Sequence, residues 1–452
     1  MTRKTNNARV TAVKVLEEVI VHGAYANLAL NKELQKSQLS QRDKSFATSL
    51  VYGNLEKWQP VDFQLARLLK KPLKKKDIVL AIILHNGVYE MLYAATPARA
   101  AVNENVELVG SLGRQEWRGL VNGVLRNFAR NSASLTWPEF TSPLAEALFF
   151  ASVPDWIGKM WLAERGAESA LSLVQALSNP TPLTLRVNSL KTDRERLLAD
   201  LHSLGFAAEK TAYSPEGINV TGNSGLFTTE LYKQGYFTVQ GEASQLAVKF
   251  LAPVSGARVL DMCAAPGGKT TYIAETMADQ GEIWAADVHK HKVELIKNAC
   301  TRLGLTSVQA VVQDSLVWGQ ERPGYFNYIL LDAPCSGLGV LSQRQDARFR
   351  KNPEDIEALV AIQRQLIDSA VKALAPGGRL IYSTCTISQR ENLANRQYLL
   401  DKYPAMGSVD LTNIFSGDDT SDSEALKQGY LELLPYKHGV DGFFISAFSK
   451  EE

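Results

Sequence analysis

The chain has 452 residues, which suits two or three domains, and its composition, 45% hydrophobic and 21% charged, is that of a globular protein. It has no run of about 18 apolar residues and no apolar stretch behind its first charges, so we expect neither a membrane span nor a secretory signal. Four cysteines without Cys-x-x-Cys spacing exclude a disulfide framework and argue against a metal site. We expect a cytoplasmic protein without metal or membrane contact.

The net charge of +1 hides an uneven distribution. Residues 1–77 carry 15 basic against 7 acidic side chains, whereas residues 401–452 carry 4 basic against 10 acidic ones. A basic amino-terminal part suggests contact with a polyanion such as nucleic acid, although a solvated basic helix face gives the same count. Charge alone leaves these two interpretations equal.

Residues 1 to about 130 have the periodicity of helices. Apolar side chains recur at spacings of three and four from Val10 through Val13 and Leu16, and again from Phe46. Ser40 is placed as the N-cap of the helix that follows it. Trp, Pro and Ser gather at residues 132–143, so we expect an all-α domain over residues 1–140.

A small α+β segment is expected over residues 141–240. Leu183–Val187 favours a strand, residues 193–204 have helical spacing and end at Gly205, and residues 236–239 again favour a strand. This segment is predicted to join the helical domain to the rest of the chain.

From about residue 256, strands alternate with helices. We expect strands at 257–262, 282–287, 308–314, 326–332 and 378–384, with a helix at about 354–375 between the last two. Such alternation is typical of a parallel sheet with helices on both faces. Residues 241–452 are therefore predicted to form a Rossmann-like α/β domain.

A glycine turn follows the first of these strands, where ligands bind in such sheets. Its backbone can approach a ligand closely, and the helix after it favours a carboxylate at its amino end. The turn comprises Cys263, Ala264, Ala265, Pro266, Gly267, Gly268 and Lys269. It is neither a dinucleotide fingerprint nor a P-loop, which argues against NAD and ATP.

Acidic residues end the next two strands. Asp287 stands 19 residues after Gly268, where an acid binds ribose hydroxyls, and Asp314 is placed to bind an adenine amino group. One such Asp alone could equally cap the following helix. Together with the glycine turn, the two acids favour S-adenosylmethionine (SAM) as the cofactor.

Two cysteines follow the fourth and fifth strands, which end in Asp332-Ala-Pro-Cys335 and Ser383-Thr-Cys385. Successive strands of such a sheet are usually neighbours, so we expect both thiols at one edge of the pocket, whereas Cys300 on an amphipathic helix is expected in the core. A thiolate that adds to carbon 6 of a pyrimidine makes carbon 5 nucleophilic. Asp332 can bind the N3/N4 edge of a cytosine, and Lys269 is a candidate for promoting the thiolate.

The segments LDMCAAPGGKT, LLDAPCSG, YSTC and HGVDGFF together resemble the RNA cytosine-C5 methyltransferases. Spacing does not decide which cysteine attacks, but the resemblance implies that Cys385 is the nucleophile and that Cys335 assists product release. It also implies that residues 263–269, Asp287, Asp314 and Asp332 bind the cofactor. DNA cytosine methyltransferases use the Pro-Cys cysteine instead.

The segments QRDKSFATSLVYGNL, GVYEMLY and GLVNGVLRNFAR are similar to the helical RNA-binding fold of NusB, and NPTPLTLRVNSLK to an intermediate RNA-binding segment. This fusion resembles 16S ribosomal RNA methyltransferases of the B type over nearly the whole chain. The resemblance implies a multi-domain protein with a class I SAM-dependent methyltransferase domain that forms 5-methylcytosine during rRNA processing. We expect a monomer.

An unpaired loop cytosine of 16S rRNA, in free RNA or an early particle, is the expected target. We expect basic residues to bind the phosphate backbone of the RNA; they are Lys70, Lys71, Lys74, Lys75, Lys76, Arg344, Arg348 and Arg350. Two alternatives remain open: a transfer RNA cytosine-C5 methyltransferase, and a non-catalytic assembly factor built on the NusB-like domain.

Overall fold

The computed structural model describes residues 7–179, 181–222, 225–415 and 422–452. By packing, the chain forms two compact units, residues 1–179 with 341–352, and residues 180–340 with 353–452. We call them the helical unit and, because the predicted cysteine pair lies in it, the catalytic unit. The division at residues 140 and 240 stays a prediction.

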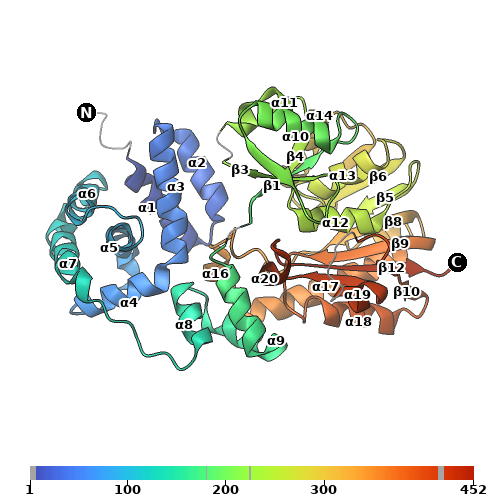
Figure 1. Ribbon diagram of the computed structural model, residues 1–452. Coiled ribbons are helices and arrows are strands. Elements are labelled where there is room, and N and C mark those ends of the chain that lie inside the picture. Colours follow the sequence, from blue (N-terminus) through green and yellow to red (C-terminus); the bar gives the residue numbers. More distant parts are fainter. Residues whose placement is uncertain (1–6, 180, 223–224, 416–421) are drawn as a thin grey trace. The chain divides into compact units, whose positions relative to one another are not determined.

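The helical unit consists of helices (Figure 1), and an apolar core joins α1 to α7. Its elements are α1 (Ala8–His22), α2 (Ala26–Lys36), α3 (Gln41–Glu56), α4 (Trp58–Leu68), α5 (Ile78–Leu92), α6 (Ala98–Ser111), α7 (Arg118–Asn131), α8 (Pro143–Phe150), α9 (Asp155–Ala176) and α16 (Ala347–Arg350). Val10, Val13 and Leu16 are buried on one face of α1, as their spacing predicts. Ser40 caps α3 by accepting a hydrogen bond from the Asp43 N–H at 3.2 Å, which confirms the predicted helix start.

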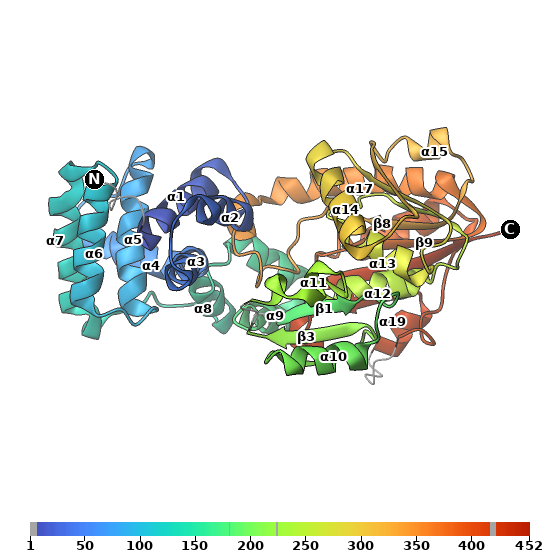
Figure 2. The same cartoon turned by 90° about the horizontal axis from the view of Figure 1, so that it is seen from above.

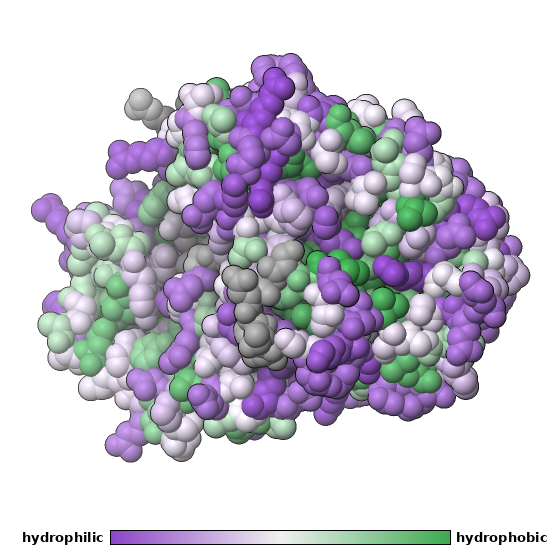
Figure 3. Space-filling model, turned by 45° about the vertical axis from the view of Figure 1, so that its right-hand side comes forward, coloured by the Kyte–Doolittle hydropathy of each residue, from purple (hydrophilic) through white to green (hydrophobic). Residues whose placement is uncertain are grey.

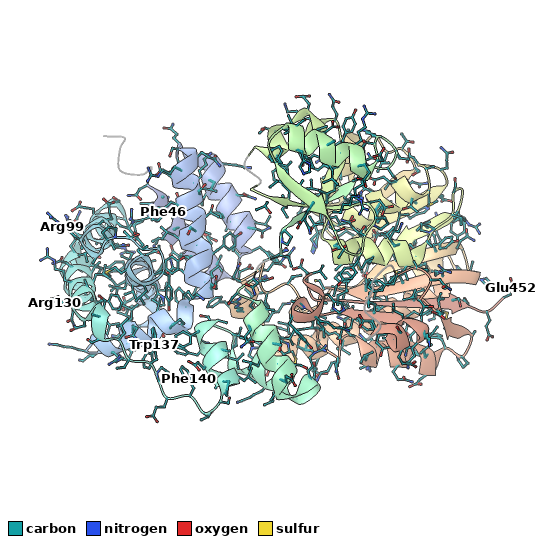
Figure 4. The ribbon with its side chains drawn as sticks, viewed as in Figure 1. Phe46, Arg99, Arg130, Trp137, Phe140 and Glu452 are labelled. Carbon is teal, nitrogen blue, oxygen red and sulfur yellow. The ribbon has the colours of Figure 1, made fainter. Side chains whose placement is uncertain are left out.

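Aromatic side chains extend this core toward α8. Trp137 and Phe140, in the segment after α7, both pack on Phe149 and Phe150 (Figure 4). Phe63 of α4 contacts Phe149 edge to face, with 5.8 Å between ring centroids. The Trp- and Pro-rich stretch expected as a domain end is therefore packed against the helices.

The catalytic unit contains a small antiparallel sheet in the order β2-β3-β1-β4. Its elements are β1 (Leu183–Val187), α10 (Arg194–Ser203), β2 (Ala207–Lys210), β3 (Gly217–Thr221), α11 (Glu230–Lys233) and β4 (Phe237–Val239). Leu185, Val187, Ile218 and Phe237 bury its apolar face against Leu197 and Leu201 of α10. The predicted strand, helix and strand of this α+β segment are confirmed.

The large sheet has the order β10-β12-β9-β8-β5-β6-β7, with β11 beside β12. Its strands are β5 (Arg258–Asp261), β6 (Glu282–Asp287), β7 (Val308–Val312), β8 (Phe326–Asp332), β9 (Leu374–Thr384), β10 (Met406–Ser408), β11 (Tyr430–Leu433) and β12 (Phe443–Lys450). The five strands β5 to β9 pair in parallel, as predicted, whereas β12 is antiparallel to β9. Asp332 of β8 lies opposite Ser383 of β9, so the two strands expected to be neighbours are neighbours.

Helices cover both faces of this sheet (Figure 1, Figure 2). The helices of this part of the chain are α12 (Glu242–Leu251), α13 (Gly268–Thr276), α14 (Lys290–Leu303), α15 (Trp318–Glu321), α17 (Pro353–Ala373), α18 (Leu393–Lys402), α19 (Ser423–Lys427) and α20 (Pro435–His438). Neighbouring strand residues divide between the faces: Val259 and Leu330 join the core under α12, α13 and α14, whereas Leu260 and Leu331 join the core under α15, α17 and α18. Period-two alternation between two apolar cores explains why these strands are apolar throughout.

Polar residues dominate the face of the molecule that Figure 3 presents, and apolar ones are scattered among them. In the part of the chain that the structure describes, no helix combines the length and the hydropathy that a membrane crossing demands.

Candidate active site

The glycine turn joins β5 to α13. The Ala264 N–H donates to the Ala286 carbonyl of β6 at 2.9 Å, and Met262 donates to Leu330 of β8 at 3.0 Å, so the turn is fixed to both neighbouring strands. Gly267 has φ +103°, and a Cβ there would lie 3.2 Å from the Ile296 backbone. Only glycine therefore gives this turn its shape and its close approach to α14.

Asp261, the last residue of β5, is buried under the turn. Its Oδ2 accepts a hydrogen bond of 2.7 Å from Thr270 Oγ1 in the first turn of α13. Burial raises the pKa of Asp261 to about 7. This buried carboxyl therefore binds the first turn of α13 and supports the glycine turn.

Asp287 is the last residue of β6, and Asp314 lies two residues after the end of β7, which is shorter than predicted. Asp287 accepts from the His289 N–H at 2.9 Å, and its other oxygen lies 3.8 Å from Lys292 Nζ. Asp314 is exposed and accepts from the Leu316 N–H at 3.0 Å. Both acids thus also make the local turn contacts of a capping residue, and their cofactor roles stay a prediction.

Lys269 and Asp332 form an ion pair across the sheet edge. Lys269 Nζ donates to Asp332 Oδ2 at 2.7 Å, and Ser383 Oγ donates to Asp332 Oδ1 at 2.8 Å. The ammonium also lies 5.2 Å from the centre of the Phe443 ring. Lys269 is therefore directed at the carboxylate of Asp332, and its expected effect on a thiol stays untested.

Cys335 and Cys385 meet where β8 and β9 end. Their Sγ atoms are 3.3 Å apart, although 50 residues separate them in the chain. The hydrogen bond to Cys385, together with burial, raises the pKa of the Cys335 thiol well above its ordinary value. At this distance the thiol of either cysteine can donate a hydrogen bond to the sulfur of the other.

The other two thiols do not join this pair. Cys263 lies in the glycine turn, where burial raises its pKa. Cys300 is buried in the core under α14, as expected, and burial raises its pKa to about 11. Among the described residues, no cluster of His, Cys, Asp and Glu is arranged to hold a metal ion.

Sequence reasoning missed Arg186, a fully buried arginine of β1 in the small sheet. It donates to the Gly268 carbonyl at 2.6 Å, to Thr271 Oγ1 at 3.1 Å and to Glu275 at 2.8 Å, and its guanidinium also contacts Gln240. These contacts hold the first turn of α13, which follows the glycine turn. An apolar strand with one arginine in its middle was the available signal.

Sequence reasoning also missed Glu391, in the loop between β9 and α18. Its side chain is buried, and it accepts hydrogen bonds from Ser336, the residue after Cys335. A glutamate within a polar stretch is ordinary surface composition, so no local signal distinguished it.

The expectation that Arg348 contacts RNA is wrong. Arg348 is 3% exposed, it donates to the Ala151 carbonyl in the helical unit, and burial lowers its pKa to about 10. Arg350 pairs with Asp346 at 2.8 Å and lies over the Tyr25 ring. These arginines dock residues 341–352 onto the helical unit, and basic composition alone could not distinguish docking from RNA contact.

The lysine-rich segment remains available for RNA. Lys70, Lys71, Lys74 and Lys76 are exposed, and the side chain of Lys75 lies outside the described part of the chain. Arg344 belongs to the segment that packs in the helical unit. RNA contact by these residues stays a prediction.

The residues at the sheet edge fit SAM. The backbone of the glycine turn is open at Gly268, where an added Cβ would meet no atom closer than 3.8 Å. The amino end of α13 favours the carboxylate of the amino acid part, and the carboxylate of Asp287 can accept from ribose hydroxyls. A parallel sheet with this turn and these strand-end acids defines a SAM-dependent methyltransferase.

Comparison with known proteins extends this classification to the whole chain. Residues 248–449 match the family model of the 16S rRNA methyltransferase RsmB/F, residues 6–130 match the NusB family, and residues 153–225 match the ferredoxin-like domain of RsmF/B-like methyltransferases. The probable ribosomal RNA small subunit methyltransferase B of Bacillus subtilis is 33% identical over 99% of this chain and all of its own length.

Solved structures agree with the fold. The crystal structure of PH0851 superposes with a TM-score of 0.83 at 24% identity, covering 97% of this chain and 98% of that one. A methyltransferase homolog from Pyrococcus horikoshii superposes with a TM-score of 0.59 at 28% identity, covering 69% of this chain and all of its own. The chain belongs to the RsmB/F family of 16S rRNA methyltransferases and is a SAM-dependent rRNA methyltransferase.

Proposed function

We propose that the protein methylates carbon 5 of one cytosine in 16S rRNA through a covalent bond between Cys385 Sγ and carbon 6 of the base. The observation that carries this proposal is the 3.3 Å distance between the sulfur atoms of Cys385 and Cys335, beside the Asp332 carboxylate on the adjacent strand. Transfer to an exocyclic amine or to a hydroxyl needs no thiol pair. Methylation at carbon 5 of a pyrimidine needs one thiolate, because carbon 5 is a poor nucleophile until a thiolate has added at carbon 6, and the second thiol is then available for the release step.

The two thiols have separate tasks in this proposal. The Cys385 thiolate forms the bond to carbon 6, and the electron pair displaced from the ring makes carbon 5 nucleophilic. SAM supplies an electrophilic methyl group. After transfer, the proton on carbon 5 leaves to a base, the ring double bond re-forms, and Cys385 is expelled as a thiolate. In this proposal the Cys335 thiol, 3.3 Å from the Cys385 sulfur, donates its own proton to that departing sulfur and becomes a thiolate in turn.

Asp332 is suited to hold the base. Its two oxygens accept from Lys269 and Ser383, and a carboxylate has about four lone-pair positions, so acceptor capacity remains for the cytosine amino group. Uracil presents a carbonyl oxygen at that position, which would face a carboxylate without a hydrogen. Asp332 would therefore favour cytosine over uracil.

The proposed substrate is an unpaired cytosine, because a base in a helical stack cannot reach a pocket at the end of a sheet. The relatives named ribosomal RNA small subunit methyltransferase B support small-subunit RNA over transfer RNA. The proposed setting is the cytoplasm, with the protein acting as a monomer on free RNA or an early particle.

The test uses the full chain with methyl-labelled SAM and transcripts of 16S rRNA and transfer RNA. The wild type is expected to form 5-methylcytosine in the 16S transcript only. C385A is expected to lose turnover by about 10³-fold or more, and C335A to accumulate a protein–RNA adduct on a denaturing gel. C300A, which removes a buried thiol outside the site, serves as the matched control and is expected to stay active.

Each arm has an outcome against the proposal. Activity in C385A would overturn the assignment of the nucleophile. Methylation of transfer RNA in place of 16S rRNA would overturn the substrate. Failure of the wild type to bind SAM in calorimetry would favour a non-catalytic assembly factor.

A further inference from the structure

Glu391 is a buried carboxylate that touches the loops of both cysteines. It lies six residues after Cys385 in the loop that leads from β9 to α18, and its side chain has no exposed surface. Its Oε1 accepts from the Ser336 N–H at 2.9 Å and its Oε2 from Ser336 Oγ at 2.5 Å. The residue directly after Cys335 is therefore held at two points by one carboxylate.

The same hydroxyl connects to the other cysteine. Ser336 Oγ lies 2.7 Å from Thr386 Oγ1, and Thr386 directly follows Cys385. Thr386 in turn accepts from Asn392 Nδ2 through its carbonyl at 2.9 Å. Glu391, Ser336 and Thr386 thus form a chain of hydrogen bonds from one thiol loop to the other.

A second group of side chains fixes the glutamate itself. Gln363 of α17 donates to Glu391 Oε1 at 3.0 Å and to the Pro334 carbonyl at 2.9 Å, so it holds the residue before Cys335 as well. Asn395 donates to Gln363 Oε1 at 2.7 Å. Tyr382 Oη donates to the Glu391 carbonyl at 2.6 Å. Within the described residues, the carboxylate is held by neutral donors.

Burial of this carboxylate lowers the stability of the folded protein. Burial raises the pKa of Glu391, since the charged form loses its water and gains no cation. An apolar side chain in its place would avoid this penalty and fill the same space. The acid fixes the residue after one reactive thiol, and Gln363, which is bound to the acid, fixes the residue before that thiol. This arrangement is better explained by geometry than by stability.

We propose that Glu391 is a positioning residue that holds Cys335 at the distance from Cys385 at which it can release the methylated product. The role rests on the proposed function, in which Cys335 acts after methyl transfer. It requires no contact between Glu391 and the RNA. Loss of Glu391 should leave attack by Cys385 possible and impair the release step selectively.

The test measures turnover and covalent adduct together in E391A and E391Q. In E391A we expect turnover to fall roughly tenfold or more, because a displacement of about 1 Å at a reacting group has effects of this size. The fraction of protein bound to RNA on a denaturing gel should rise toward that of C335A. The Kd for SAM should stay within about twofold, since no Glu391 contact reaches the glycine turn.

E391Q distinguishes position from charge. The amide oxygen can still accept from the Ser336 N–H, and the hydroxyl of Ser336 can rotate to accept from the amide nitrogen. E391Q should therefore recover most of the turnover and lose most of the adduct. E90A serves as the matched control, because Glu90 is an equally buried carboxylate of the helical unit. It should lower the melting temperature without adding adduct.

S336A keeps the proposal testable if E391A does not fold. It removes the hydroxyl that joins Glu391 to Thr386 and retains the backbone, so it should raise the adduct fraction in the same direction. If C335A traps RNA while folded E391A or S336A does not, the positioning role is wrong and the proposed function stands. If C335A itself traps no RNA, the proposed two-thiol function fails first.

Discussion

Arg186 and Glu275 form an ion pair in which neither side chain has any exposed surface. Arg186 comes from the small sheet, and Glu275 comes from α13, which packs on the large sheet. The same guanidinium donates to the Gly268 carbonyl at the start of α13. The small sheet therefore does more than join two domains. It contributes Arg186 to the support of the helix that follows the glycine turn.

This pair gives a first prediction. R186K keeps the charge but cannot supply the planar fork of donors that reaches Glu275, Thr271 and Gly268 together, so we expect the Kd for SAM to rise about tenfold. R186A should also lower the free energy of unfolding by about 3–5 kcal/mol, because it leaves the Glu275 charge buried without its partner. Calorimetry with SAM and denaturant unfolding measure the two effects.

The apolar double variant R186M/E275L separates stability from cofactor binding. It should regain much of the lost stability, since well-packed apolar side chains can replace a buried ion pair. The Kd for SAM should nevertheless stay raised, because the hydrogen bond to the Gly268 carbonyl is still missing. Wild-type SAM affinity in R186K would contradict the positioning role.

A second prediction concerns Lys269 and Asp332. If Lys269 acts through Asp332, K269M should lower kcat/KM about tenfold and D332N by a larger factor, on the order of 10²-fold. The double variant K269M/D332N should be no worse than D332N alone, because the lysine then has no carboxylate to orient. Single-turnover methyl transfer measures all three. Fully additive losses would show that Lys269 has a task of its own.

Asp261 predicts a pH dependence of stability. Its pKa is about 7 in the folded protein, against 3.8 for an ordinary Asp, so the folded state holds a proton that the unfolded state releases between these values. The stability it contributes is complete below about pH 4 and is lost as the pH rises toward 7, by up to about 1.4 kcal/mol per pH unit. D261N mimics the protonated form and can still accept from Thr270.

The measurement is the free energy of unfolding of wild type and D261N at pH 5, 6 and 7. The difference between the two should change in favour of D261N as the pH rises. A difference independent of pH would mean that Asp261 is ionised in both states across this range.

The lysine segment gives a fourth prediction. K70E/K71E should weaken binding of 16S rRNA and flatten its salt dependence, with the log–log slope falling by roughly 0.7–0.9 for each phosphate that the protein no longer neutralises. K372E/K427E, which reverses two exposed lysines of the catalytic unit, is the matched control. Filter binding between 50 and 200 mM salt, roughly the range over which phosphate contacts are resolved, measures the slopes. Equal effects of both pairs would point to net charge alone.

The sequence made the catalytic sheet predictable because its signals are local. Strands flanked by glycine and acidic residues follow one another with regular spacing, and the adjacency of β8 and β9 follows from the handedness and order of such sheets. That adjacency placed Cys335 beside Cys385. The added antiparallel strand β12 has no such signal, since its partner β9 lies far earlier in the chain.

The supporting residues could not be predicted in the same way. Arg186 meets Glu275 across 89 residues, and Glu391 meets Ser336 across 55, so neither contact leaves a periodic trace. Arg348 failed for the opposite reason. Its charge suggested a surface contact with RNA, but Arg348 is buried where it binds the Ala151 carbonyl, 197 residues away in the chain.

Residues 341–352 leave the catalytic unit directly after the Cys335 loop and complete the helical unit, where Phe349 packs edge to face on Trp58. The helical unit is thus discontinuous. A ribosome that adds roughly 5–20 residues per second delivers this last piece on the order of ten seconds or more after residue 179. Until then Phe349 does not cover Trp58. A nascent or truncated chain that stops before residue 341 therefore exposes apolar surface that the finished protein covers.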